Sequence, residues 1–233
     1  MSCAYSVIIP AYNEEKTISR AVHETVRVFD ALHAPYEIIV VDDGSTDRTV
    51  AAAERLARSV PQMVLVRHAR NLGKGAAVRT GVERAVGEVF LFLDADLATR
   101  PSEFRNFIPA MRTADIVIGS RTARGAVIAR RQPAYRVLAG KLFNLLAVRW
   151  YLGLPFHDTQ CGFKAFRKKT KLLFRDMTSS GWAFDAELLA RARKARFKIT
   201  ELPVEWRHGR ESQVHLRDAL QIMKELRKIK MAL

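Results

Sequence analysis

The segment VFLFLDADLATRPSEF, residues 89–104, joins a run of five apolar residues directly to two aspartates, Asp94 and Asp96. A continuous apolar run is typical of a strand that is buried on both faces, as in a parallel sheet covered by helices. Ligands of such sheets bind at the carboxyl ends of the strands. The segment therefore predicts an α/β fold with two acids at the ligand-binding edge of its sheet.

The first half of the chain repeats this pattern. β-branched runs also occur at residues 5–11, 36–43, 63–69 and 114–121. Helical patterns separate the runs at residues 15–32, 45–59 and 74–87, with Asn13 as the expected cap of the first helix and Ser45 or Thr46 of the second. Strands that alternate with helices predict a mostly parallel central sheet with helices on both faces.

Polar residues follow each predicted strand, and they suggest what binds there. Asp94 and Asp96, at positions i and i+2, can converge on one hard cation such as Mg²⁺ or Mn²⁺, which would stabilise the negative charge of a departing diphosphate. A bare Asp-x-Asp also occurs by chance in solvated loops. Its position at the end of an apolar strand favours the metal site here.

Two neighbouring strand ends add nucleotide-binding chemistry. Asp42 and Asp43 can accept hydrogen bonds from a base imide or a ribose hydroxyl, and Lys74 is a donor suited to phosphate. The spacing around Lys74 is not that of a P-loop, and no G-x-G-x-x-G follows the first strand. For Ser45 and Asp47 we prefer an Asx turn and helix capping.

The second half of the chain is less regular. A nearly all-apolar helical pattern covers residues 134–156, a polar turn begins at 157, a helix is expected at 182–195, a strand at 198–206 and an amphipathic helix at 215–233. The run KAFRKKTKLLFR, residues 164–175, has six basic residues and no acidic one, which is consistent with a solvated loop or helix face. We expect one domain with a C-terminal extension.

Composition limits the partners. The 233 residues carry a formal net charge of +15, which suits nucleic acid, anionic lipid or a phosphate substrate. Nucleic acid is disfavoured, because acids occupy the predicted ligand edge and the aromatic residues lie mostly in apolar runs. Two cysteines, no signal-peptide pattern and no apolar stretch of about 18 residues predict a cytoplasmic protein without a spanning helix.

Several segments match a known family in order. SVIIPAYNEE, IIVVDDGSTDRT, RNLGKGAAVRTG, FLDAD and IVIGSR, within residues 5–121, resemble glycosyltransferase family 2, which has the GT-A fold. DTQCGFKAF, GWAFDAELL and PVEW resemble its dolichyl-phosphate β-glucosyltransferase branch among the polyprenyl-phosphate glycosyltransferases. This resemblance implies transfer of glucose from UDP-glucose to a polyprenyl or dolichyl phosphate. Open alternatives are a mannosyltransferase of the same lipid, a transferase to a saccharide hydroxyl, or an inactive scaffold.

The resemblance also implies a role for each matching residue. Asp158, Asp96 and Arg121 would be catalytic, and Asp94 with Asp96 would hold Mg²⁺ or Mn²⁺. Gln213 departs from the Lys of many relatives. The nucleotide sugar would contact Pro10, Tyr12, Glu14, Asp42, Asp43, Lys74, Asp94, Ala95 and Asp96. The donor and acceptor phosphates would contact Arg121, Arg131, Arg207 and Ser212.

The implied mechanism is an inverting attack of a lipid phosphate oxygen on C1 of the sugar. A phosphate monoester is largely ionised at neutral pH, since its second pKa is about 6. We therefore expect Asp158 to position a substrate and not to act as a base, with Asp185 as a second-rank catalytic candidate. Structural roles are expected for Cys161, His68, His157, His208, Trp182 and Phe184.

Residues 1–212 are expected to form the GT-A domain, with a nucleotide-sugar half at 1–121, an acceptor half at 122–212, and a tail helix at 213–233. The lipid acceptor implies peripheral binding at the cytoplasmic face of a membrane. The 134–152 segment and the tail suit an interfacial position, but each could instead pack on the core.

Overall fold

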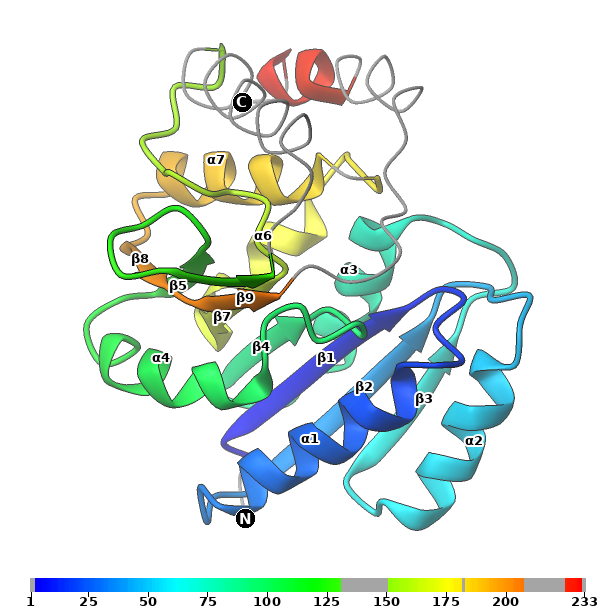
Figure 1. The fold of residues 1–233 in the computed structure, drawn as a ribbon. Coiled ribbons are helices and arrows are strands. Elements are labelled where there is room, and N and C mark those ends of the chain that lie inside the picture. Colours follow the sequence, from blue (N-terminus) through cyan, green and yellow to red (C-terminus); the bar gives the residue numbers. More distant parts are fainter. Residues whose placement is uncertain (1–2, 131–150, 182, 208–224, 232–233) are drawn as a thin grey trace.

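The computed structural model of the chain describes residues 3–130, 151–181, 183–207 and 225–231. A seven-stranded sheet forms its centre, in the order β3-β2-β1-β4-β7-β5-β8 (Figure 1). Every neighbouring pair in this sheet is parallel except the two that β7 makes with β4 and β5. The strands are β1 Tyr5–Ala11, β2 Tyr36–Asp42, β3 Met63–Arg67, β4 Val89–Leu93, β5 Ile116–Ser120, β7 Phe163–Arg167 and β8 Ile199–Pro203. A small parallel pair, β6 Val127–Arg130 and β9 Glu205–Arg207, lies beside it.

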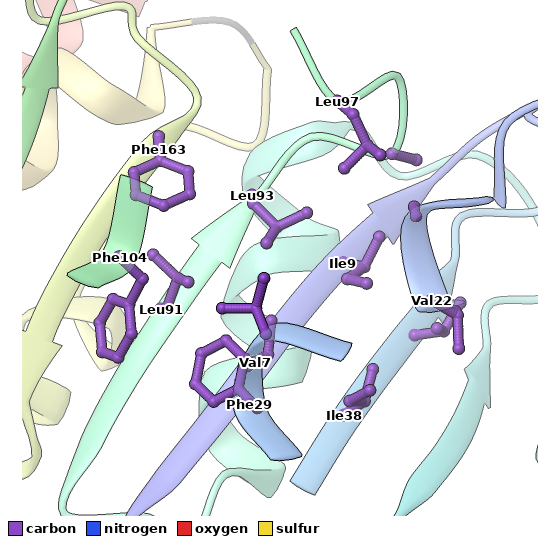
Figure 2. Close-up of a cluster of buried hydrophobic side chains, with 14 of the residues drawn as sticks. Val7, Ile9, Val22, Phe29, Ile38, Leu91, Leu93, Leu97, Phe104 and Phe163 are labelled. Atoms are coloured by element: carbon purple, nitrogen blue, oxygen red, sulfur yellow. The ribbon is translucent and has the colours of Figure 1, made fainter. Parts of the chain in front are cut away.

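Helices cover both faces of the sheet, as predicted. One face carries α1 Ile18–Asp30, α2 Thr49–Ser59 and α4 Phe104–Ala110, which the 3₁₀ turn η1 Pro101–Glu103 precedes. The other face carries α3 Lys74–Arg84, α6 Leu172–Arg175 with the 3₁₀ turn η3 Lys168–Lys171, and α7 Phe184–Lys194. Successive residues of a strand point to opposite faces. Val7 and Ile9 accordingly pack in the core between the sheet and α1, α2 and α4 (Figure 2). Ile8 packs in the core on the opposite face, under α3, α6 and α7.

The basic run at 164–175 is the main correction to the predicted fold. Its first part belongs to β7, a buried central strand, and Lys164 is fully buried there. The Lys164 ammonium donates to the Cys161 carbonyl and to Asp185, both at 2.5 Å. A buried ammonium needs such partners. The basic run shows no acid nearby in the sequence, so it predicts a solvent-exposed lysine, and the partner that allows burial, Asp185, lies 21 residues away.

The helix caps predicted at Asn13 and at Ser45 or Thr46 are also wrong. Thr17 precedes α1 and makes no side-chain cap, while Asn13 adopts a φ of 56° and accepts a hydrogen bond from Thr46 N at 2.9 Å. Helix α2 begins at Thr49. The Asx turn expected at Asp47 is present, because its Oδ1 accepts a hydrogen bond from Thr49 N at 2.9 Å. The expected strand at 198–206 divides into β8 and β9.

Strand direction positions the site. Strands β1 to β5 are mutually parallel within the main sheet, so their carboxyl ends meet at one edge. The antiparallel β7 begins at that edge, with Phe163 paired to Leu93. The polar turn before β7, residues 157–162, therefore lies beside Asp94 and Asp96, and the two halves of the chain share a single sheet.

The described part of the tail, residues 225–231, is helical. Leu226 and Ile229 are fully buried there against Ala183 and Ala186 at the start of α7. This part of the tail therefore packs on the protein, whereas most of the 134–152 segment and the rest of the tail lie outside the described residues. Across those residues, no helix combines the length and the hydropathy that a membrane span requires.

Candidate active site

The aspartate pair lies at the carboxyl end of β4. Asp94 forms an ion pair with Lys74, 2.6 Å between Oδ1 and Nζ. The chain then folds back through Leu97, at a φ of 55°, and Asp96 accepts a hydrogen bond from Ala98 N at 2.9 Å. Burial and the neighbouring Asp94 carboxylate raise the pKa of Asp96. The two acids thus form a partly uncompensated negative centre.

This centre fits a divalent cation. Within the described residues no group of three His, Cys, Asp or Glu side chains could hold a metal by itself. Mg²⁺ is commonly bound through one or two carboxylates, with waters and substrate phosphates as its other ligands. Asp94 and Asp96 offer that donor set at the end of β4.

A glycine that the sequence analysis did not single out makes room for this centre. Gly162 immediately precedes β7, and an added Cβ would lie 2.0 Å from Asp94 Oδ2. Any side chain at this position would displace the carboxylate. The only sequence signal is the glycine inside CGF, and its meaning depends on β7 lying next to β4.

Lys74 connects the aspartates to a second charge pair beneath them. Burial alone would lower the pKa of Lys74, but Asp94 and Asp185 raise it, so the ammonium stays charged. Asp185 is 3% exposed and is paired with Lys164. Burial raises the pKa of Asp185, and Lys164 and Lys74 oppose that rise. This position suits Asp185 as a structural support for Lys74.

Adjacent acids at the end of β2 have different surroundings. Asp43 accepts hydrogen bonds from His68 at 2.7 Å, Leu72 N at 2.9 Å and Gly73 N at 2.8 Å, so both of its oxygens hold the β3–α3 loop. Asp42 is 1% exposed; its Oδ2 accepts from Ser45 N at 3.3 Å, whereas its Oδ1 has no hydrogen-bond partner among the described residues. A buried, unsatisfied carboxylate oxygen indicates a missing donor.

The loop after β1 is held against the loop after β2. Asn13 N donates to Ser45 at 3.0 Å, and Glu14 N donates to Thr49 at 2.7 Å. The Glu14 carboxylate accepts from Thr17, and burial together with Asp96 and Asp94 raises its pKa against that hydrogen bond. Glu14 is thus within electrostatic reach of the aspartate pair, at the edge where buried Pro10 and half-buried Tyr12 also lie.

Asp158 and Arg121 form a bidentate ion pair across the same edge. Arg121 Nε lies 2.6 Å from Asp158 Oδ2, its Nη2 lies 2.9 Å from Oδ1, and its backbone N–H also donates to Oδ2 at 2.9 Å. Burial would raise the pKa of Asp158, but Arg121 holds it below its usual range. The Arg121 guanidinium lies 5.5 Å from the Trp206 ring centroid.

Glu201 of β8 fixes the turn that carries Asp158, and the sequence analysis missed it. Its carboxylate accepts from Asp158 N at 2.8 Å and from His157 N at 3.0 Å. In the next residues, Thr159 Oγ1 and Gln160 Nε2 are buried without partners in the described part of the chain. No local pattern marks Glu201, because it lies 43 residues after Asp158.

The remaining residues have mixed outcomes. Cys161 is a buried thiol, as expected, and burial followed by the Asp158 charge raises its pKa to about 11. His68 bridges Asp43 and Thr80, and Phe184 packs 5.8 Å from Phe92. Arg207 is exposed and pairs with Glu205 at 2.7 Å. Arg131, Trp182, His208, Ser212 and Gln213 lie outside the described residues.

Comparison with known proteins identifies the family of this chain. The model of the family described as Glycosyl transferase family 2 matches residues 6–189. The chain belongs to glycosyltransferase family 2. Within the family, the chain is 34% identical to the dolichyl-phosphate beta-glucosyltransferase ALG5A of Trichomonas vaginalis, over 96% of this chain and 72% of that protein. It is 30% identical to the dolichyl-phosphate beta-glucosyltransferase of Saccharomyces cerevisiae, over 97% and 74%.

Solved structures show the same fold at lower identity. Mycobacterium tuberculosis glucosyl-3-phosphoglycerate synthase in complex with Mn²⁺, UDP and glucosyl-3-phosphoglycerate superposes with a TM-score of 0.71 and 22% identity, over 97% of this chain and 80% of that one. Staphylococcus aureus TarS 1–349 in complex with UDP gives 0.63 and 18%, over 97% and 65%. These likenesses show the fold alone, which is the predicted GT-A fold.

Proposed function

We propose that this family 2 enzyme transfers glucose from UDP-glucose to a polyprenyl phosphate such as dolichyl phosphate, with inversion at the anomeric carbon. The observation that carries the proposal is the meeting of two charge centres at one sheet edge. Asp94, Asp96 and Lys74 suit a diphosphate with its metal, and Asp158 with Arg121 suits the reacting sugar and an anionic acceptor. The names of the similar proteins support glucose and the dolichyl phosphate.

The donor would bind over the ends of β1, β2 and β4. The unsatisfied Asp42 Oδ1 suits the imide N–H of a uracil. Asp43 would accept a hydrogen bond from the ribose and would also hold the β3–α3 loop in place beside the nucleotide. Lys74 would bind the diphosphate, and Asp94 and Asp96 would hold Mg²⁺ or Mn²⁺. That ion would supply charge stabilisation for the leaving UDP. Pro10, Tyr12, Glu14 and Ala95 would line the same edge.

The acceptor would bind on the Asp158 side. A phosphate monoester needs cations more than a base, because it is already ionised at neutral pH. Arg121 would attract it while Asp158 holds the guanidinium in place, and a carboxylate whose pKa is lowered is a weak base. We extend the phosphate-binding role to Arg207, Arg131 and Ser212 as part of the same proposal.

The lipid acceptor requires contact with a membrane. We propose peripheral binding at the cytoplasmic face, supported by the net charge of +15, since each basic residue near an anionic surface contributes about 1 kcal/mol. Flotation with anionic liposomes, with and without residues 213–233, tests the tail. Because Leu226 and Ile229 are buried, we expect the truncated chain to lose stability as well as any binding that the tail provides.

One assay tests the proposed reaction. The purified chain is incubated with Mg²⁺ or Mn²⁺, a panel of nucleotide sugars and a short polyprenyl phosphate, and nucleotide release is measured. We expect UDP release that depends on the lipid phosphate and is fastest with UDP-glucose. Preference for GDP-mannose would assign a different donor, and release that depends on a saccharide acceptor would overturn the lipid assignment.

A further inference from the structure

A second basic site lies away from the proposed active site, where α1 meets η1 and α4. A surface cavity of about 240 Å³ opens there. Phe29 of α1 and Phe104 of α4 stack at 5.1 Å between their ring centroids, so the two helices that frame the cavity share one packed core. The cavity is lined by Glu24, Arg27, Val28, Arg100, Ser102 and Arg105. None of these residues belongs to the proposed active site.

The charges around this cavity are unbalanced. Arg27, Arg100 and Arg105 form no ion pair with a carboxylate in the described part of the chain. Glu24 is the one acid among the lining residues, and it is already paired with Arg20 at 2.7 Å. Three guanidinium groups that meet at one cavity repel one another, and an anion between them would remove that repulsion.

Arg100 provides a second, independent sign of a missing ligand. Its Nε is buried and has no hydrogen-bond partner among the described residues. Arg27, Ser102 and Arg105 are exposed around it, so the cavity is open to a solute. Burying a guanidinium N–H without an acceptor is unfavourable, and most such groups in proteins have a partner.

We propose that this cavity binds a phosphoryl group. Guanidinium groups present paired N–H donors that match phosphate oxygens, and the Ser102 hydroxyl adds a neutral donor. The cavity volume suits a phosphate or a small phosphorylated headgroup and is below that of typical drug-sized pockets, about 300 Å³ or more. The phosphoryl group could come from a soluble phosphorylated molecule or from a phospholipid headgroup at the membrane.

Titration of the full chain with inorganic phosphate tests the site, with backbone amide chemical shifts as a local readout. We expect Ser102 and Arg105 to shift, and the affinity to fall at least about 10-fold in R27Q/R105Q, because two charge-assisted contacts are lost. The matched control is R55Q/R58Q, which removes the same charge from the exposed face of α2 and should leave the affinity unchanged. Shifts confined to the active-site edge, or an equal loss in the control, would overturn the proposal.

Thermal unfolding of R100Q keeps the test informative if the double variant folds poorly. Without phosphate, we expect R100Q to unfold no earlier than the wild type, because the buried Arg100 Nε has no hydrogen-bond partner to lose among the described residues. Phosphate should raise the unfolding temperature of the wild type but not that of R100Q. A phosphate-induced rise of the same size in R100Q would contradict the assignment of Arg100.

Vesicles distinguish the two sources. Sedimentation is compared for phosphatidylcholine vesicles with and without phosphatidic acid. Binding to phosphatidic acid that R27Q/R105Q loses and R55Q/R58Q keeps would assign a lipid headgroup. Phosphate binding without that difference would assign a soluble phosphorylated ligand. Failure of the glucosyltransferase assay would leave this result intact, because no active-site residue is changed.

Discussion

The two halves of the proposed active site both pair a carboxylate with a cationic side chain, but they differ in how far the negative charge is balanced. Asp158 is 4% exposed and accepts three hydrogen bonds from Arg121, so its charge is fully matched. Asp94 is 32% exposed beside Lys74, and Asp96 next to it has a raised pKa. The Asp158 side is thus fully paired within the protein, whereas the Asp94 side keeps negative charge that the proposed divalent cation would balance.

The largest expected effect comes from the Asp94 and Asp96 side, where the negative charge is not fully balanced. The double variant D94N/D96N should lower kcat/KM by at least about 10³-fold. Without the two carboxylates the proposed divalent cation is no longer held, and the leaving diphosphate loses the charge stabilisation that this cation would supply. The measurement is lipid-dependent UDP release with saturating Mn²⁺, with E54Q of α2 as a control. Undiminished turnover in the double variant would show that these acids do not serve the reaction.

The Asp158–Arg121 side, where the charges are matched, should respond differently when its acid is made neutral. In D158N the half-buried Arg121, whose side chain is 29% exposed, loses its counter-charge. This loss should cost up to about 3 kcal/mol of stability and lower kcat/KM about 10²-fold at every pH tested. The double variant R121Q/D158N should lose less stability than D158N. Recovery of D158N activity at high pH would instead identify Asp158 as a base.

The same pair predicts an acid transition. The folded pKa of Asp158 lies below its unfolded value of about 3.9, so its stabilising contribution is present above that pH and is lost as the pH falls through the folded pKa. Acid unfolding of the wild type, followed by circular dichroism, should therefore show a loss of the Asp158 contribution to the free energy of unfolding below about pH 4. D158N should lack that contribution, and an unchanged acid profile would contradict it.

Gly162→Ala tests the contact between the two halves. The new Cβ would meet Asp94 Oδ2 at 2.0 Å, so the carboxylate must move, and we expect kcat/KM to fall about 10²-fold. Gly153→Ala is the matched control, because an added Cβ there meets nothing within 4 Å, although its φ of +66° brings some strain. Equal activity in the two variants would show that Asp94 tolerates displacement.

The smallest effect is expected from Glu14→Gln. Burial and the nearby aspartates raise the pKa of Glu14, so its negative charge lowers the stability of the folded protein at neutral pH. This destabilisation disappears as the pH falls and the carboxylate becomes protonated. The variant should unfold at the same or a slightly higher temperature at neutral pH, by less than about 4 °C. Calorimetry should show this without Mn²⁺, and a lower unfolding temperature would mean that Glu14 stabilises the loops.

The parallel part of the fold and half of the site could be predicted because their signals are local. Apolar runs such as 89–93 are recognisable by themselves, and parallel strands bring Asp42, Lys74 and Asp94 to one edge whatever their exact order. The Arg121–Asp158 pair was not predicted as a pair, since its members lie 37 residues apart and only resemblance connected each with the site.

By itself, then, the sequence determined the α/β class, the sheet edge at which the strands end and the acids that lie there, because side-chain periodicity and strand polarity are properties of short segments. Only the tertiary structure decided that β7 enters the sheet in reverse, that Lys164 is buried against Asp185, and that Gly162 admits Asp94. Each of these depends on a partner far along the chain, and the free energy of burying a charge is set by that partner and not by its sequence neighbours.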